Sequence, residues 1–215
     1  MIRLLLVESQ RLARDGLRLL IEREPDMVVV GEASGVEDAA LTAGDCHPTV
    51  ILLDADIAGV DLAEAVADIR RSVPEVGFVA LSGTCVDEVI GRALEARVLG
   101  FTLKEEGFDQ VCDAIRAVAK GEYHYTRRAM DRVATESGEV DPGGNSKTRY
   151  HLLTRRERQL LRLLASGLSL KDACRSLEIS YKTADKHKVN LMRKLDIHDR
   201  VELARYAIRE KIIEA

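Results

Sequence analysis

The chain has 215 residues and a formal net charge of -4, with 46% hydrophobic and 32% charged residues. This length suits one large domain or two small ones, and the hydrophobic content excludes a wholly disordered chain. No apolar run reaches the roughly 18 residues that a membrane helix requires, and the N-terminus lacks a signal-peptide cleavage site. The four cysteines are widely scattered and fit no metal-ligand spacing. We therefore expect a reduced, cytoplasmic protein that does not associate with membranes.

The charges are distributed unevenly along the chain. Residues 1–120 carry 12 Lys and Arg against 22 Asp and Glu, a net charge of -10. Residues 149–215 carry 16 Lys and Arg against 9 Asp and Glu, a net charge of +7. This asymmetry indicates two domains with different partners, and the basic one is a candidate for binding nucleic acid.

The first part of the chain alternates strand and helix patterns. Short apolar runs at 2–7, 27–30, 50–53, 78–81 and 100–103 are separated by helical patterns near 11–24, 36–44, 61–72, 87–96 and 108–120. Strands that are apolar on both sides and separated by helices favour a parallel sheet covered on both faces. We predict an α/β doubly wound, five-stranded parallel sheet over residues 1–121.

Polar side chains follow four of these strands. Asp54 follows the third strand, and Glu8, Ser82 and Lys104 follow the first, fourth and fifth. Because ligands of such sheets bind at the carboxyl ends of the strands, we expect these groups to converge. Asp54 is then a candidate carboxylate nucleophile for phosphoryl transfer, with a divalent cation, Ser82 and Lys104 binding the phosphoryl oxygens.

Residues 122–148 are predicted as a linker. A short helix is expected around 127–135, and the stretch ESGEVDPGGNSKT at 136–148 has too little apolar surface to build a core.

The remaining residues, 149–215, predict an all-α domain of four helices. Thr154 with Glu157, Ser169 with Asp172, Ser180, and Asp199 with Glu202 all match helix N-cap patterns. Gly167 stands where the first helix should end. The middle two helices, joined by a short turn near 177–179, form a helix-turn-helix arrangement.

The third of these helices, near 180–194, carries a basic face. Lys and Arg neutralise phosphates, and Asn and Lys can bind base edges, so this helix is suited to reading the major groove of double-stranded DNA. The residues with helical spacing on this face are Thr183, Lys186, His187, Asn190, Arg193 and Lys194.

The tail resembles the LuxR-type helix-turn-helix of NarL/FixJ response regulators over its whole length, from LLTRRERQLLRLLASGLSLKDACRSLEIS to KVNLMRKL and beyond. The resemblance implies base contacts at Asp185, Lys186 and Val189. It also implies that the last helix, near 199–213, supports a homodimer. Positions at or near the DNA backbone in that family correspond to Lys182, Thr183, His187, Lys188 and Lys194.

Residues 1–120 independently resemble the receiver domain of response regulators. The resemblance implies that Asp54 is the phosphoacceptor, with Ser82, Phe101 and Lys104 in the switch, Mg²⁺ as cofactor, and a sensor histidine kinase as partner. Receivers usually place two adjacent acids after the first strand, whereas this chain has Glu8 followed by Ser9. Because a hydroxyl is a poor ligand for a hard cation, the metal site is weakened. Asp56 stands at the position whose backbone carbonyl binds the metal in that family. Its side chain is a candidate to replace the missing charge.

Three functions follow from these patterns. The first is a transcription regulator, not an enzyme, that is controlled by phosphorylation of Asp54. The second is a DNA-binding regulator whose degenerate receiver acts without phosphorylation, which Ser9 favours. The third is a phosphatase of the DxD type, because Asp54 and Asp56 have that spacing, but such an enzyme does not account for the basic tail.

Overall fold

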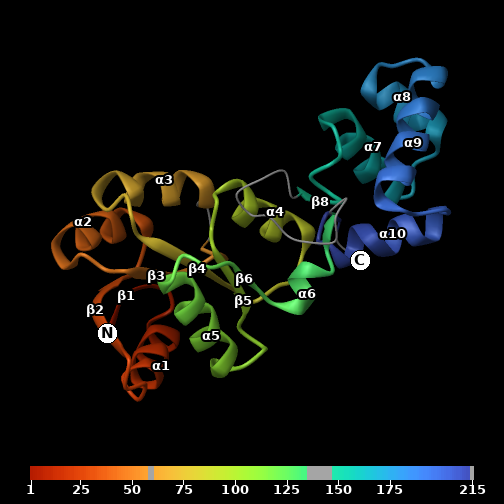
Figure 1. Ribbon diagram of the computed structural model, residues 1–215. Helices are drawn as coiled ribbons and strands as arrows, with labels where there is room; N and C mark the ends of the chain where they lie inside the picture. The colour runs from red at the N-terminus through yellow and green to blue at the C-terminus, as the bar shows by residue number, and fades with distance from the viewer. Residues whose placement is uncertain (58–60, 135–146, 214–215) are drawn as a thin grey trace.

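The structure, a computed structural model, describes residues 1–57, 61–134 and 147–213. It contains an N-terminal sheet unit and a C-terminal helical unit, which lies next to the end of the sheet unit that carries helix α4 (Figure 1). Most of the polar stretch predicted as a linker, residues 135–146, falls outside the described residues.

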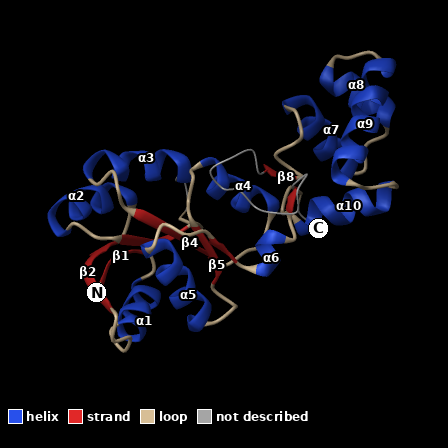
Figure 2. Cartoon of the chain, in the orientation of Figure 1, coloured by secondary structure: helices blue, strands red, loops and turns tan. Residues whose placement is uncertain are grey.

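The sheet is parallel, and its strands alternate with helices along the chain. Its strands are β1 (Ile2–Val7), β2 (Met27–Ala33), β3 (Val50–Asp54), β4 (Gly77–Ser82), β5 (Gly100–Leu103) and β6 (His124–Tyr125). They are hydrogen-bonded in the order β2-β1-β3-β4-β5-β6. Figure 2 shows the strands of this sheet in red, with blue helices on both sides. The predicted doubly wound α/β fold is confirmed, and burial of both sheet faces explains why the strands are nearly continuous apolar runs.

The predicted number of strands was wrong by one. His124 and Tyr125 form a sixth strand, which pairs with Gly100 and Phe101 of β5. A strand of two residues is too short to produce an alternating apolar pattern, so it could not be predicted from the sequence. The sheet thus extends into the range predicted as linker.

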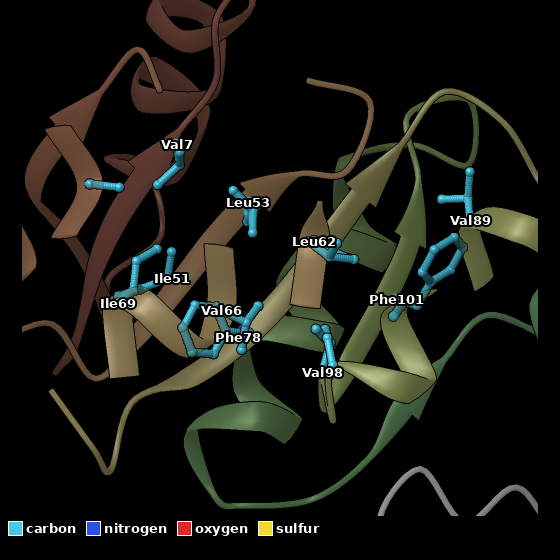
Figure 3. Close-up of a cluster of buried hydrophobic side chains, with 14 of the residues drawn as sticks. Val7, Ile51, Leu53, Leu62, Val66, Ile69, Phe78, Val89, Val98 and Phe101 are labelled. Atoms are coloured by element: carbon cyan, nitrogen blue, oxygen red, sulfur yellow. The ribbon is translucent and has the colours of Figure 1, made fainter. Parts of the chain in front are cut away.

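Two hydrophobic layers hold the helices against the sheet. Helices α2 (Val36–Cys46), α3 (Leu62–Ser72) and α4 (Asp87–Glu95) cover one face, and α1 (Arg11–Ile21) and α5 (Phe108–Ala119) cover the other. Alternate residues of each strand point to opposite faces. In β3, for example, Ile51 and Leu53 pack under α3, as Figure 3 shows, whereas Val50 and Leu52 belong to the layer under α1 and α5.

Three short elements follow the sheet. These are α6 (Arg127–Met130), β7 (Val133–Ala134) and β8 (Lys147–Thr148), and the two strands pair antiparallel. The helix expected around 127–135 is therefore only four residues long.

The helical unit has four helices, and their caps agree with the sequence. They are α7 (Arg155–Ala165), α8 (Leu170–Leu177), α9 (Tyr181–Leu195) and α10 (Arg200–Arg209). Thr154 and Glu157 form a reciprocal capping box, and Ser169, Ser180 and Asp199 each accept a backbone N–H. Gly167, with φ of +96°, adopts the left-handed conformation just beyond α7, which favours glycine. Among the described residues, no helix is long and apolar enough to cross a membrane.

Candidate phosphorylation site and nucleic-acid interface

The carboxyl edge of the sheet brings three charged side chains together. Glu8 lies directly after β1, Asp54 ends β3, and Lys104 lies directly after β5. The ammonium group of Lys104 is 3.1 Å from Glu8 Oε2 and 3.1 Å from Asp54 Oδ1. Both carboxylates are buried, so the lysine bridges two acids in a site that is largely shielded from water.

The environment shifts the pKa of both Asp54 and Lys104. Burial, together with the nearby Glu8 carboxylate, raises the pKa of Asp54, and these effects outweigh the opposing hydrogen bonds from the Asp56 N–H group and from Lys104. Burial disfavours the charge on Lys104, but hydrogen bonds to Glu8 and Asp54 outweigh it and raise the pKa of the lysine. Lys104 is therefore charged at neutral pH and supplies the positive charge of the site.

The donor set for Mg²⁺, the ion expected for a receiver domain, is incomplete in this arrangement. Glu8 accepts from the backbone N–H of Gln10 and from Lys104, and Asp54 Oδ1 accepts from Asp56 and Lys104. Ser9 is exposed and contributes at most a hydroxyl group. Among the described residues, no three His, Cys, Asp or Glu side chains are grouped to hold a metal ion. Glu8 and Asp54 therefore offer two carboxylates to a Mg²⁺ ion, both already bound to Lys104, and the second acid that receivers usually place after the first strand is missing at Ser9.

The side chain of Asp56 points to β4. Its Oδ1 atom is 2.9 Å from the hydroxyl group of Ser82, and its Oδ2 atom accepts a hydrogen bond of 2.5 Å from the N–H group of Gly83. Ser82 itself is fully buried. Asp56 thus binds the hydroxyl group of Ser82 and does not extend the acidic pair toward a metal.

Phe101 lies within the core of the sheet unit. Its side chain is fully buried, and its ring stacks on Tyr125 of β6 with a centroid distance of 5.8 Å. The Tyr125 hydroxyl group donates a 2.9 Å hydrogen bond to the carbonyl of Val98, which fixes the ring. This partner of Phe101 could not be predicted, because β6 itself was not predicted.

Helix α9 presents a basic face to solvent. Lys182, Lys186, Val189 and Arg193 recur at helical spacing, and all four are exposed. Ala184, Leu191 and Leu195 are buried on the opposite side, where they hold α9 against the other helices. Of the other residues predicted to contact DNA, Thr183 and Asp185 are exposed. The half-buried ones are His187, Lys188, Asn190 and Lys194.

Lys194 differs from the other basic residues of α9 in its partner. Its ammonium group is 2.7 Å from Glu157 Oε2, and this carboxylate is buried. Glu157 also completes the capping box at the start of α7. In this arrangement Lys194 joins α9 to α7, a role that its position in the sequence did not reveal.

Both the sheet unit and the helical unit match known protein families. Residues 4–116 match the family described as "Response regulator receiver domain", and residues 151–207 match "Bacterial regulatory proteins, luxR family". The chain belongs to the response regulators that combine a receiver domain with a LuxR-type DNA-binding domain. As a response regulator of this family it is a transcription regulator and not an enzyme, which sets aside the phosphatase interpretation of Asp54 and Asp56.

Several relatives match this response regulator over nearly the whole length of both chains. The transcriptional regulatory protein LiaR of Bacillus subtilis is 32% identical over 213 residues, covering 99% of this chain and 100% of LiaR. The response regulator protein VraR of Staphylococcus aureus is 28% identical over 216 residues and 99% of both chains. RcsB of Salmonella enterica serovar Typhimurium, solved with promoter DNA and a phosphomimetic, shares the fold with a TM-score of 0.64 at 18% identity, covering 99% of this chain and 100% of that structure.

The receiver and helical parts of this response regulator meet at a buried polar cluster. Asp87, at the start of α4, accepts hydrogen bonds from Arg132 at 2.9 Å and from the Tyr206 hydroxyl at 2.9 Å. Arg132 is also 2.6 Å from Glu210, whose other oxygen accepts from the backbone N–H of Asp87 at 2.6 Å. We call Asp87, Arg132, Tyr206 and Glu210 the polar cluster. The sequence did not predict it, because its members are separated by up to 123 residues and match no short motif.

Proposed function

We propose that this response regulator binds specific double-stranded DNA through α9, inserted in the major groove. The observation that carries the proposal is the exposed face of Lys182, Lys186, Val189 and Arg193 on the second helix of a helix-turn-helix. The ammonium and guanidinium groups neutralise phosphates or bind guanine, and the exposed Val189 can contact a thymine methyl group. Asp185 accepts a hydrogen bond from a cytosine amino group or repels other bases.

The DNA-bound form is proposed to be a homodimer. A single small module gives limited specificity, so two copies on paired half-sites about one helical turn apart are expected. The apolar residues Val201 and Ile208 of α10 are exposed and are available for contacts between two copies. A solved structure of RcsB contains two dimers of that protein bound to two parallel DNAs, which supports this arrangement. The protein then acts in the cytoplasm.

The receiver is proposed to take its signal at Asp54, with a sensor histidine kinase as donor. A carboxylate oxygen of Asp54 attacks phosphorus, and the bond from phosphorus to the donor breaks as the donor keeps its electron pair. Asp54 Oδ1 is already engaged by Lys104 and Asp56, which favours Oδ2 as the attacking atom. Lys104 then stabilises charge on the transferred oxygens and is the cation that the chain itself supplies at this site.

The second candidate function is a regulator that acts without phosphorylation. Two observations favour it: Ser9 stands where a receiver normally has an acid, and Asp56 already binds Ser82. Incorporation of radioactive label from acetyl phosphate, lost in Asp54→Asn, would eliminate this candidate. Label measured with and without magnesium separates metal-dependent from metal-independent transfer.

We propose that the receiver spans residues 1–121, the linker 122–148 and the DNA-binding domain 149–215. Because β6 pairs with β5, the sheet unit continues to Tyr125. A fragment ending after Tyr125 is therefore expected to unfold at a higher temperature than one ending at Gly121.

Selection of DNA from a random duplex library tests the proposed function. The full-length protein should enrich a sequence with two similar half-sites separated by about one helical turn. The variant Lys186→Ala should lose this enrichment, whereas Lys120→Ala, at the exposed end of α5, should retain it. Failure of the unmodified protein to enrich any sequence would contradict DNA recognition by α9.

A further inference from the structure

The carboxylate of Asp56 lies beside the phosphoacceptor and binds two hydrogen-bond donors of β4 and its following loop. Its oxygens are 2.9 Å from Ser82 Oγ and 2.5 Å from the Gly83 nitrogen. Its own backbone N–H donates to Asp54 Oδ1 at 2.9 Å. Asp56 thus links the end of β3 to the end of β4 by hydrogen bonds beside Asp54.

The Ser82 hydroxyl group has one proton and two neighbouring acceptors. The carbonyl of Thr84 lies 3.0 Å away and the Asp56 carboxylate 2.9 Å away. A charged carboxylate is the stronger acceptor, so the proton is directed to Asp56. The lone pairs of the hydroxyl oxygen accept from the Thr84 N–H group, which closes the loop toward α4.

A phosphoryl group on Asp54 would add oxygens with negative charge at this edge of the sheet. Hydrogen-bond donors that are held in place nearby stabilise such charge. The donors that the structure provides are the Lys104 ammonium group, the Ser82 hydroxyl group and the Gly83 N–H group. Two of the three are bound to Asp56.

We propose that Asp56 is an internal occupant of the phosphoryl pocket, whose carboxylate takes the hydrogen bonds of Ser82 and Gly83 that a phosphoryl group on Asp54 would otherwise take. The receiver therefore holds Ser82 in place without phosphate, and Asp54 is phosphorylated only when Asp56 swings out. Asp56 is exposed, so this movement does not disturb the core. The part of the proposal that concerns phosphorylation rests on Asp54 being the acceptor.

Hydrogen exchange measured by mass spectrometry tests the placement of Asp56 without any phosphodonor. In Asp56→Ala, exchange of the backbone amides at 83 and 84 should be at least tenfold faster than in the unmodified protein. The matched control is Asp45→Asn, which alters an exposed carboxylate near the end of α2, at the opposite edge of the sheet, and should leave this exchange unchanged. Equal exchange in Asp56→Ala and the unmodified protein would overturn the proposal.

Radioactive acetyl phosphate, with magnesium chloride present, tests the competition itself. The initial rate of labelling of Asp54 should rise at least threefold in Asp56→Ala, because Ser82 and Gly83 are released for the incoming group. A labelling rate that is equal or lower in Asp56→Ala would overturn the proposal. If neither protein takes up label while exchange increases as expected, phosphorylation of Asp54 is contradicted and the placement of Asp56 stands.

Discussion

The hydroxyl group of Tyr206 donates a 2.9 Å hydrogen bond to the carboxylate of Asp87, and both side chains are buried. The two residues are 119 positions apart, one on α10 of the DNA-binding domain and the other at the start of α4 of the receiver. The carboxylate of Glu210, directly after α10, is buried in the same place. Since two buried carboxylates repel each other, the guanidinium group of Arg132 between them holds the contact together.

Replacement of Arg132 is expected to separate the two domains. Arg132→Ala leaves Asp87 and Glu210 buried without a shared cation. Breaking a buried ion pair in this way costs about 3 kcal/mol of stability. Tyr206→Phe removes one hydrogen bond and should cost only about 1 kcal/mol. Small-angle X-ray scattering should show a larger radius of gyration for Arg132→Ala. The matched control is Arg128→Ala, which breaks only an exposed ion pair with Glu105 and should scatter like the unmodified protein.

Gly91 offers a steric test of the same contact. A Cβ atom at this position of α4 would overlap the imidazole ring of His151. Alanine favours a helix over glycine by about 1 kcal/mol, so Gly91→Ala should not weaken α4 itself. We expect faster hydrogen exchange in the segment at 148–151 and an unchanged receiver. Gly16→Ala, in an α1 position with open space around it, serves as control. Unchanged exchange in Gly91→Ala would show that α4 does not hold His151.

His151 is expected to make the contact sensitive to pH. The Thr148 hydroxyl donates to the carbonyl of Asp87 and therefore accepts from the Nδ1–H group of His151, which places the proton of the neutral ring on Nδ1. Burial lowers the pKa of His151 despite the nearby Glu95, with Arg158 acting in the same direction as burial. A histidine whose pKa is lower in the folded state stabilises the fold above its ordinary pKa of about 6.5, and this contribution is lost as pH falls through the folded value.

The measurement for His151 is the thermal unfolding of the full-length protein between pH 7.5 and pH 5. The midpoint should decrease on acidification by more than in His151→Gln. The same decrease in both proteins would assign the effect to other groups.

Lys104 is expected to stabilise the acidic site. Lys104→Ala leaves Glu8 and Asp54 buried next to each other without a cation, so the free energy of unfolding should fall by about 3 kcal/mol. Asp54→Asn in the same background removes one of the two charges and should restore part of this loss, which urea unfolding can measure. Lys120→Ala is the control, because its side chain is exposed at the end of α5. Additive effects of the two substitutions would show that Lys104 and Asp54 do not interact.

Local patterns made much of this structure predictable. The capping residues Thr154, Ser169, Ser180 and Asp199 are read from a few neighbouring positions, and the structure places each at the predicted helix start. Strand ends that carry Glu8, Asp54 and Lys104 meet at one edge simply because the sheet is parallel.

Features that depend on distant contacts were not predictable. The direction of the Asp56 side chain is decided by donors on a neighbouring strand, and the polar cluster is assembled from three distant parts of the chain. Strand β6 was missed because its two residues are ordered by pairing with β5 and not by their own pattern. Lys194 shares the spacing of the basic face, yet its partner Glu157 lies on another helix.

The salt dependence of DNA affinity tests the recognition by α9 most directly. Each phosphate contact contributes about one unit to the slope of the logarithm of affinity against the logarithm of salt concentration. Lys188→Ala should weaken binding, reduce this slope by about one and leave the preferred sequence unchanged, whereas Lys186→Ala should weaken binding and relax the preference. Affinities of both variants equal to that of the unmodified protein would contradict the assignment of α9 as the recognition helix.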